Sequence, residues 1–381
     1  MQQLSKSLIT KIRSEFDFLE GYTFLNSAGV APISNSATNG MKKFLNSGSW
    51  EGDSYFRLRA NTIEDCRKLA GSIIGADSSE IAFVRSTSEG ISLVASGLEY
   101  LPDDEVLISN LEYPSNVYPW LNLEQDQVKT VMIKSIDGKI DFDQFRNKMS
   151  PKTKLISTSS AQFATGFRPN LAKFSKIARD GGVLFLVDAI QTLGAFPIDV
   201  KSAKIDFLTA GSVKWLCGPE GIGIFFCSSN MLEKLKLTKV GWNSVVDPLA
   251  FHKIDFRFKK SAARFEEGAS NLLGIVGLHY ALELILSIGV EDIANHILEL
   301  GDIFIDEISS HPEYEIVSPV DNISTRSGII LFAPKDRSAI DVLLEKLSKN
   351  RIIVAKRGDG IRVSPHFFNT VDDIMRLVSF L

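Results

Sequence analysis

Two stretches of sequence decide the fold, Val183-Leu-Phe-Leu-Val-Asp-Ala-Ile-Gln191 and Gly211-Ser-Val-Lys-Trp-Leu-Cys-Gly-Pro219. The first is a continuous apolar run that ends in one acid, Asp188, as expected of a buried strand in a parallel sheet. The second follows another apolar run and carries one lysine, Lys214. An acid and an amine at the ends of two neighbouring buried strands predict a site for a ligand that has a cationic ring nitrogen and a carbonyl group.

Before residue 240, short continuous apolar runs typical of buried strands alternate with segments whose apolar residues recur at helical spacing. We expect strands at residues 80–86, 105–109, 128–133, 154–158, 183–187, 206–210 and 221–226, and helices at 58–74, 114–124, 141–148 and 170–180. This alternation predicts an α/β fold whose mostly parallel sheet is covered by helices. After residue 255 helices at 272–288 and 291–309 precede a mixture of short strands and helices. We therefore expect a large domain over residues 21–255 and a smaller α+β domain formed by residues 1–20 and 256–381.

The composition is that of a globular protein with a sizeable core. The 381 residues are 44% hydrophobic and 23% charged, and the formal net charge of −4 gives no basic field that would favour nucleic acid or an anionic membrane. No apolar run is long enough to predict a membrane-spanning helix, and the N-terminal segment reads as an amphipathic helix rather than a signal peptide. Three cysteines without a pattern predict neither a disulfide framework nor a metal site, which favours the cytoplasm.

Polar and aromatic side chains follow several of the predicted strands. In open parallel sheets ligands bind beyond the carboxyl ends of the strands, so we expect these side chains to share one edge: Thr87, Tyr113, Gln162, Asp188 and Ser212 to Lys214. Thr87-Ser88 also begins a helix, where free N–H groups can bind a phosphate, although an ordinary helix cap explains the same residues equally well. Asn26-Ser-Ala-Gly-Val-Ala-Pro32 is a loop of small residues that lets the backbone approach a ligand, or an ordinary turn.

Pyridoxal phosphate fits this edge of the predicted sheet. Its pyridinium nitrogen needs an acid such as Asp188, its aldehyde needs an amine such as Lys214, and its phosphate needs a helix N-terminus. The sequence therefore predicts a pyridoxal-phosphate site.

With these residues assembled, the chain resembles the class V branch of the fold-type I pyridoxal-phosphate enzymes. The resemblance rests on Gln162-Phe-Ala-Thr-Gly-Phe-Arg168, Val187-Asp-Ala-Ile-Gln191 and Lys214-Trp-Leu-Cys-Gly-Pro-Glu-Gly-Ile-Gly223, and it runs from about Asn26 to Asn369. These stretches look most like the isopenicillin N epimerase-like subgroup. The resemblance implies a seven-stranded sheet in the large domain and a homodimer whose active site lies at the interface.

The resemblance also implies a role for individual residues. Lys214 would form the Schiff base and move the Cα proton, Asp188 would keep the pyridinium nitrogen protonated, and Tyr113 would stack on the ring as the third catalytic residue. The cofactor-binding set implied by the resemblance is Thr87, Ser88, Tyr113, Gln162, Asp188, Gln191, Ser212, Lys214, Trp242 and Ser270. Gln162 would donate a hydrogen bond to the ring's phenolic oxygen, with Gln191 beside it. Ser270 would reach the phosphate of the partner subunit.

Substrate binding is implied at Asn26, Gly29 and Arg362, where the arginine would bind the α-carboxylate of an amino acid with two hydrogen bonds. Arg357 is a second candidate for a side-chain carboxylate, and a solvated loop charge explains it better. No metal ligands are expected.

The type of reaction depends on what surrounds Lys214. Cysteine desulfurases carry a proton-moving histidine where this chain has Tyr113, and they need a mobile nucleophilic cysteine in the small domain. Here the first histidine is His252, and all three cysteines precede residue 228. These two absences argue against a desulfurase.

We therefore expect an aminotransferase-like enzyme that acts at the Cα of a small-molecule amino acid. A kynureninase-like C–S or C–C lyase and an amino-acid epimerase are the alternatives. A protein that binds the cofactor without catalysis is disfavoured because Lys214, Asp188 and Arg362 occur together.

Overall fold

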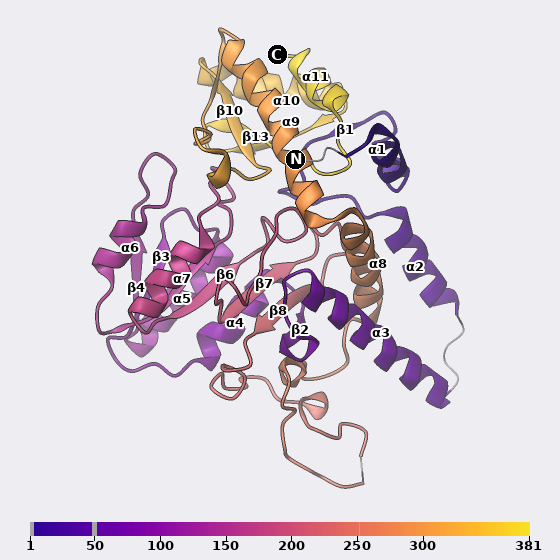
Figure 1. Cartoon of the computed structure of the whole chain (residues 1–381), viewed down its shortest axis with the longest axis vertical. Helices are drawn as coiled ribbons and strands as arrows, with labels where there is room; N and C mark the ends of the chain where they lie inside the picture. The colour runs from indigo at the N-terminus through magenta and orange to yellow at the C-terminus, as the bar shows by residue number, and fades with distance from the viewer. Residues whose placement is uncertain (1–3, 48–51, 251) are drawn as a thin grey trace.

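A seven-stranded sheet forms the centre of the computed structural model, which describes residues 4–47, 52–250 and 252–381 (Figure 1). Its strands are β2 (Ile81–Val84), β3 (Glu105–Ser109), β4 (Lys129–Ile133), β5 (Thr153–Ser159), β6 (Leu184–Asp188), β7 (Phe207–Gly211) and β8 (Gly223–Cys227). They lie in the order β2-β8-β7-β6-β5-β3-β4, and β8 alone runs antiparallel to its neighbours. The predicted α/β class and the mostly parallel seven-stranded sheet are confirmed.

Both faces of this sheet are buried, which explains why its strands are apolar without alternation. On β6, Phe185 and Val187 join one hydrophobic core and Leu186 joins the other. The first core includes residues from α6 (Phe142–Lys148) and α7 (Leu171–Asp180), and the second includes residues from α4 (Thr87–Gly97) and α5 (Tyr118–Asn122). Successive strand residues point to opposite faces, so a strand covered on both sides must be apolar throughout.

The C-terminal part of the chain builds a second, four-stranded antiparallel sheet in the order β12-β13-β10-β9. Its strands are β9 (Tyr314–Ile316), β10 (Ile330–Pro334), β12 (Ala355–Arg357) and β13 (Gly360–Val363). The helices α9 (Val290–Ser310), α10 (Ile340–Lys349) and α11 (Val371–Val378) share a core with these strands. Figure 1 shows this part above the large sheet.

The remaining elements connect the two parts. The short strand β1 (Thr23–Phe24) pairs with β11 (Ile352–Ile353), and Arg13 of α1 (Lys6–Arg13) bonds to Asp373 of α11 at 2.7 Å. Helix α8 (Leu272–Ile288) packs against α2 (Asn35–Asn46) and α3 (Gly52–Ser72). The division into residues 21–255 and the rest stays a prediction, and residues 1–3, 48–51 and 251 of those ranges lie outside the described part.

Local differences from the expected elements have physical causes. The helix expected near 114–124 is split into a 3₁₀ turn at Pro114–Asn116, α5 and a second 3₁₀ turn at Leu123–Asp126, because Pro114 and Pro119 each start a new segment. No single helix of the described residues is long and apolar enough to cross a membrane. Only α8 and α9 taken together have that length and apolar character, and they are bent by 77° relative to each other.

Candidate active site

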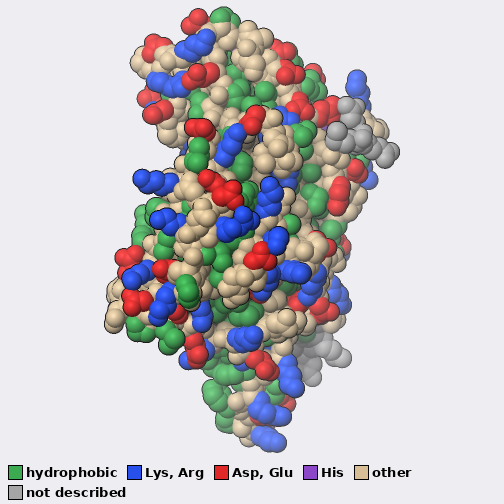
Figure 2. All heavy atoms as spheres, turned by 60° about the vertical axis from the view of Figure 1, so that its left-hand side comes forward, with side chains coloured by type: hydrophobic (Ala, Val, Ile, Leu, Met, Phe, Trp, Pro, Cys, Tyr) green, Lys and Arg blue, Asp and Glu red, His purple; other side chains and the backbone are tan. Residues whose placement is uncertain are grey.

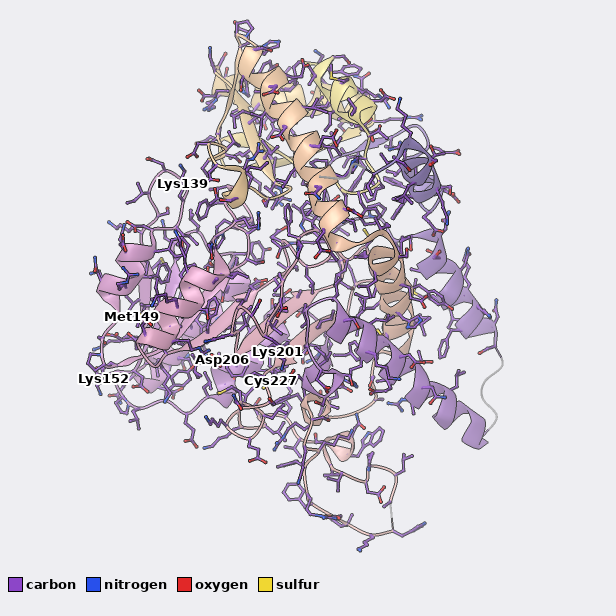
Figure 3. The ribbon with its side chains drawn as sticks, viewed as in Figure 1. Lys139, Met149, Lys152, Lys201, Asp206 and Cys227 are labelled. Carbon is purple, nitrogen blue, oxygen red and sulfur yellow. The ribbon has the colours of Figure 1, made fainter. Side chains whose placement is uncertain are left out.

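The carboxyl ends of β2, β3, β5, β6 and β7 lie along one edge of the large sheet, because these five strands run in the same direction. Figure 3 labels Asp206 and Cys227 at the opposite edge, where β7 begins and β8 ends. The first edge faces the small domain. Lys139, labelled in the same view, reaches across with its Nζ 2.7 Å from Asp321.

Asp188 ends β6 and is only 1% exposed. Its Oδ1 accepts a hydrogen bond from the Ile190 amide at 3.0 Å, and its Oδ2 is buried with no hydrogen-bond partner. Burial, and to a smaller degree the nearby Glu112, raises the pKa of Asp188 to about 7, against the effect of the Ile190 hydrogen bond. A buried acid with one unsatisfied oxygen is costly unless a donor binds there.

Lys214 follows β7 in a turn beside the same edge, and its Nζ lies 5.6 Å from the ring centre of Tyr113. Burial lowers the pKa of Lys214 to about 8, and the positive charges of Arg362 and Arg357 lower it further, while Asp188 opposes the shift. A lysine that loses its proton near neutral pH can act as a nucleophile and as a base. Tyr113 is 45% exposed and meets Phe163 edge to face at 5.1 Å.

Arg362 comes from β13 of the small domain and is only 1% exposed. It donates to the Phe163 carbonyl at 3.0 Å and to Asn26 Oδ1 at 3.3 Å, while its Nε is buried without a partner. Burial and the charge of Arg357 lower the pKa of Arg362 to about 9. No carboxylate lies within salt-bridge distance of Arg362 in the described part of the chain, so this guanidinium is set to receive an anion.

Asn26 and Gly29 are placed together with Arg362. The Gly29 amide donates to the Asn26 carbonyl at 2.9 Å, and a Cβ on Gly29 would lie 2.7 Å from Asn26 Nδ2. A larger residue at position 29 would therefore displace the Asn26 side chain that contacts Arg362. Arg357 lies on the same face of the hairpin as Arg362, because Arg362 pairs with Ala355 and residues two apart on a strand share a face.

The predicted phosphate residues gather at the start of α4. Thr87 is the first helical residue, and its Oγ1 accepts from the Gly211 amide at 2.8 Å, which joins α4 to the end of β7. Ser88 bonds to Ser115 at 2.7 Å on the surface. Ser212 donates to the Pro219 carbonyl. The helix cap itself is Ser86, which accepts from the Glu89 amide at 3.2 Å.

Gln191 is buried and both ends of its amide are bonded within this chain, and its place beside the ring stays a prediction. Its Oε1 accepts from Trp215 Nε1 at 3.0 Å and its Nε2 donates to the Ala28 carbonyl at 3.3 Å. The amide thus joins the turn after β6 to Trp215, the neighbour of Lys214, and to the loop at residues 26–31. The Nε2 of Gln162 donates to Glu112 and its Oε1 is buried without a partner, and its hydrogen bond to the ring's phenolic oxygen stays a prediction.

Trp242 and Ser270 have no described contact with Lys214, Asp188 or Arg362 within this chain. Trp242 is 43% exposed, with Arg59 5.7 Å from its ring centre. The Oγ of Ser270 is buried and has no partner.

Sequence reasoning missed Glu112. This carboxylate is 6% exposed and lies between Tyr113 and the end of β3. Its signal was weak, because an acid before Tyr-Pro is typical of a surface turn. The residues on either side of Glu112 in the sequence do not indicate that its side chain is buried.

The edge fits pyridoxal phosphate. The unpartnered Asp188 Oδ2 suits a pyridinium N–H, Lys214 suits the aldehyde, and the N–H groups at the start of α4 suit the phosphate. A model of the class-V aminotransferases matches residues 23–377. This chain belongs to that family.

Named relatives agree with the family and revise the reaction. A probable cysteine desulfurase of Borreliella burgdorferi is 31% identical over 82% of this chain and 78% of its own length. The apo cysteine desulfurase of Thermococcus onnurineus superposes with a TM-score of 0.88 at 21% identity, covering 97% of this chain and 96% of its own. A C-DES variant with glycine covalently linked to its pyridoxal-phosphate cofactor superposes with a TM-score of 0.89 at 21% identity, covering 96% and 98%.

The fold-type I fold and the pyridoxal-phosphate dependence of the family are thus confirmed. The expectation of an aminotransferase-like enzyme, with a desulfurase disfavoured, is contradicted by the names of these relatives. The two absences behind it concern the proton donor and the sulfur acceptor, and neither bears on the shared fold or the cofactor.

Proposed function

We propose that this protein uses pyridoxal phosphate to cleave the C–S bond of a cysteine-type amino acid. The observation that supports this most is the convergence of Lys214, Asp188 and Arg362 on one buried edge. Asp188 Oδ2 and Arg362 Nε have no hydrogen-bond partner among the described residues, and the pKa of Lys214 is lowered to about 8. The name of the 31% identical relative supports sulfur chemistry. When bound, the cofactor supplies an electron sink for a carbanion at the Cα of the substrate.

The residues of this chain divide the remaining work. Arg362 binds the α-carboxylate and fixes the substrate, with Asn26 limiting where the guanidinium can turn. Lys214 holds the cofactor through its amine and moves the Cα proton, for which its lowered pKa suits it. Asp188 would accept the N–H of the cofactor ring through its unpartnered Oδ2, and Tyr113, whose ring centre lies 5.6 Å from Lys214 Nζ, would contact that ring.

No cysteine of this chain is placed to take up the sulfur. Cys66, Cys217 and Cys227 are the three cysteines of the sequence, all are buried, and burial raises the pKa of each thiol. The sulfur therefore passes to an external thiol, so that cysteine and RSH give alanine and RSSH, or leaves as sulfide, so that cysteine and water give pyruvate, ammonia and H₂S. Either balance needs no oxidant.

A product-resolved assay tests this proposal. The loaded protein is given cysteine or cystine with and without dithiothreitol, and alanine, pyruvate and sulfide are measured separately, beside a Lys214→Ala control. Alanine that depends on thiol indicates transfer, and pyruvate indicates elimination. Borohydride reduction of a separate sample verifies that the cofactor is attached to Lys214; if the unreduced loaded protein then forms none of the three products from either substrate, the proposal is refuted.

We also propose a homodimer in the cytoplasm, and membership of the isopenicillin N epimerase-like subgroup stays a prediction. Large apolar side chains are exposed on the arm at residues 240–258, among them Ile254 at 92% and Phe256 at 70% (Figure 2, lower end). Such exposure is typical of an interface. The reach of Ser270 into the partner's site stays a prediction, since its Oγ is buried within the single chain. Light scattering of the purified protein measures the oligomeric state.

A further inference from the structure

A cavity separate from the cofactor edge lies where the layer formed by α6 and α7 meets the small domain (Figure 1). Its volume of about 360 Å³ falls within the range of about 300–1,000 Å³ that is typical of small-molecule sites. The large domain lines it with residues from 168–173 and 192–203, and the small domain lines it with residues from 322–325. Lys214, Asp188 and Arg362 are not among its lining residues.

Arg168 presents a positive charge without an acid partner to this cavity. Its Nε donates to the Arg326 carbonyl at 2.7 Å, and its Cζ lies 4.8 Å from the ring centre of Phe196, which also lines the cavity. These contacts fix the guanidinium and use only one of its N–H donors. Among the described residues no carboxylate lies within salt-bridge distance of Arg168, and burial lowers its pKa without an acid to oppose the shift. Both Nη groups therefore remain to bind a ligand.

Lys173 brings a second cation to the same cavity. Its Nζ lies 5.5 Å from the ring centre of Phe142, and an aromatic face attracts a cation without neutralising its charge. The one acid among the lining residues is Asp199, whose Oδ1 accepts from the Lys201 amide at 2.9 Å and the Ser202 amide at 2.8 Å. This carboxylate stabilises its own turn, so two cations and one acid leave the cavity positively charged.

The rest of the wall suits an organic molecule better than a bare ion. The large domain contributes several apolar side chains and the small domain contributes polar residues, among them Leu171, Pro197 and Ile198 on one side and Asn322, Ser324 and Thr325 on the other. A molecule in the cavity would therefore contact both domains. Its preferred form is an oxyanion carried by an apolar body.

The cavity reaches the active site only through the backbone of Asp188. Ser160 and Thr192 both line the cavity, and their hydroxyls bond to each other. Ser160 also donates its amide to the Asp188 carbonyl at 2.8 Å and its hydroxyl to the same oxygen at 3.1 Å. The cofactor would instead bind the carboxylate of Asp188, so the two sites are distinct.

We propose that this cavity binds a small organic anion, with a carboxylate or phosphate group on the Arg168 guanidinium and an apolar body against the wall of the large domain. The site is separate from the one at Arg362 and does not depend on the reaction that the enzyme catalyses. The alternative is that Arg168 only joins the loop at residues 162–168 to the small domain through the Arg326 carbonyl.

Calorimetric titration with phenyl phosphate and with benzoate tests the proposal without any turnover. The holoenzyme is first reduced with borohydride, so that the cofactor stays on Lys214 and its own phosphate fills the site at the start of α4. We expect saturable binding of at least one probe at about one site per chain, and the tighter probe shows whether the site prefers phosphate or carboxylate. Benzyl alcohol, which has a similar body without the charge, should bind at least about tenfold more weakly.

Variants locate the bound probe. Arg168→Gln should raise the Kd at least about tenfold, and Lys173→Gln, which removes an exposed charge, should raise it about threefold. Arg264→Gln is the matched control, because Arg264 also donates to a backbone carbonyl and lies over an aromatic ring but does not line this cavity. Its Kd should stay within about twofold of wild type.

The reduced Arg362→Leu holoenzyme separates this site from the substrate site, and it should bind the probe as wild type does. Two results would overturn the proposal: no saturable binding of either probe by wild type, or binding that survives Arg168→Gln and is lost in Arg362→Leu. If Arg168→Gln does not fold, a Kd unchanged by Lys173→Gln overturns it instead.

Discussion

Replacing Asp188 by asparagine should stabilise the cofactor-free protein, although Asp188 serves the cofactor. The pKa of this carboxyl rises from 3.8 to about 7 on folding, mainly through burial. The difference is about 3 units, and each unit corresponds to about 1.36 kcal/mol, so the ionised carboxylate costs the folded apo-protein about 4 kcal/mol at high pH. Asparagine keeps an oxygen for the Ile190 amide and removes the charge.

The sign of the pH dependence follows from proton binding. The folded protein binds more protons at Asp188 than the unfolded chain does between pH 3.8 and about 7, so this carboxyl makes the free energy of unfolding fall as pH rises through that window. The advantage of Asp188→Asn should therefore be about 2 kcal/mol at pH 5, reach about 4 kcal/mol near pH 8.5 and stay level above it. In this variant Lys214 loses the nearby charge of Asp188 that favours its protonated form, and because its pKa is already lowered to about 8 it can become neutral.

Urea unfolding of the apo-protein at pH 5, 7 and 8.5 measures this difference. Asp180→Asn is the control, because Asp180 is an exposed acid of α7 that pairs with Lys176, and it should show no comparable gain. The same Asp188→Asn protein should bind pyridoxal phosphate more weakly. An Asp188→Asn apo-protein that is no more stable than wild type at pH 8.5, or whose gain does not grow with pH, refutes the reasoning.

Two further predictions concern Arg362 and the Gly166 turn that packs against Ile329. Arg362→Leu should lower kcat/KM for the amino-acid substrate at least a hundredfold while leaving the cofactor absorbance intact. The apo-protein should be no less stable, because the substitution removes a buried cation that has no acid partner. Lys356→Gln, on the other face of β12, is the control. Gly166→Ala should cost at least about 2 kcal/mol in thermal unfolding, because the new Cβ would lie 2.0 Å from the Ile329 carbonyl at a φ of +73°. Gly182→Ala, with a φ of +67° and no atom within 4 Å, should show only the smaller backbone cost, and equal losses in the two variants would contradict the clash.

The cofactor was predictable because its partners are marked locally. A buried strand that ends in one acid and a turn that carries one lysine are features of short segments, and the sheet brings such segment ends to one edge. The strands of the large sheet were found for the same reason, and β6 and β7 lie within one residue of their expected positions.

What could not be predicted depends on contacts between distant segments. Glu112 is notable only once β5 lies beside it, and the partners of Gln191, Trp215 and Ala28, come from other segments of the chain. The reaction was misjudged for a related reason. The absence of a histidine and of a small-domain cysteine was read as the absence of an activity, but those residues handle the proton and the sulfur, and the surrounding scaffold is shared with relatives named for that activity.

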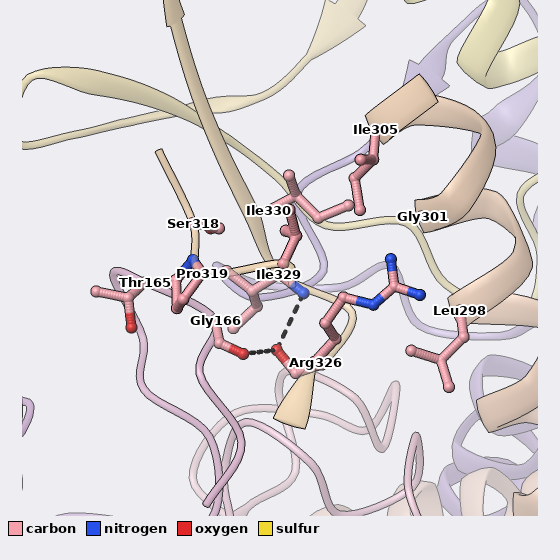
Figure 4. Close-up of a pocket in the computed structure, with 12 residues that line it drawn as sticks. Thr165, Gly166, Leu298, Gly301, Ile305, Ser318, Pro319, Arg326, Ile329 and Ile330 are labelled. Atoms are coloured by element: carbon pink, nitrogen blue, oxygen red, sulfur yellow. Dashed lines mark hydrogen bonds between the residues drawn. The ribbon is translucent and has the colours of Figure 1, made fainter. Parts of the chain in front are cut away.

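The loop at residues 162–168 belongs to both parts of the molecule. At one end Gln162 bonds to Glu112. Next to it, the Phe163 carbonyl accepts from Arg362, and further along the loop the Gly166 carbonyl accepts from the Ser327 hydroxyl, which also accepts from the Ile329 amide (Figure 4). A chimera that takes its small domain from a relative with another substrate must therefore take this loop as well. If the small domain were exchanged without this loop, the arginine of the new domain would meet a Phe163 carbonyl positioned for Arg362.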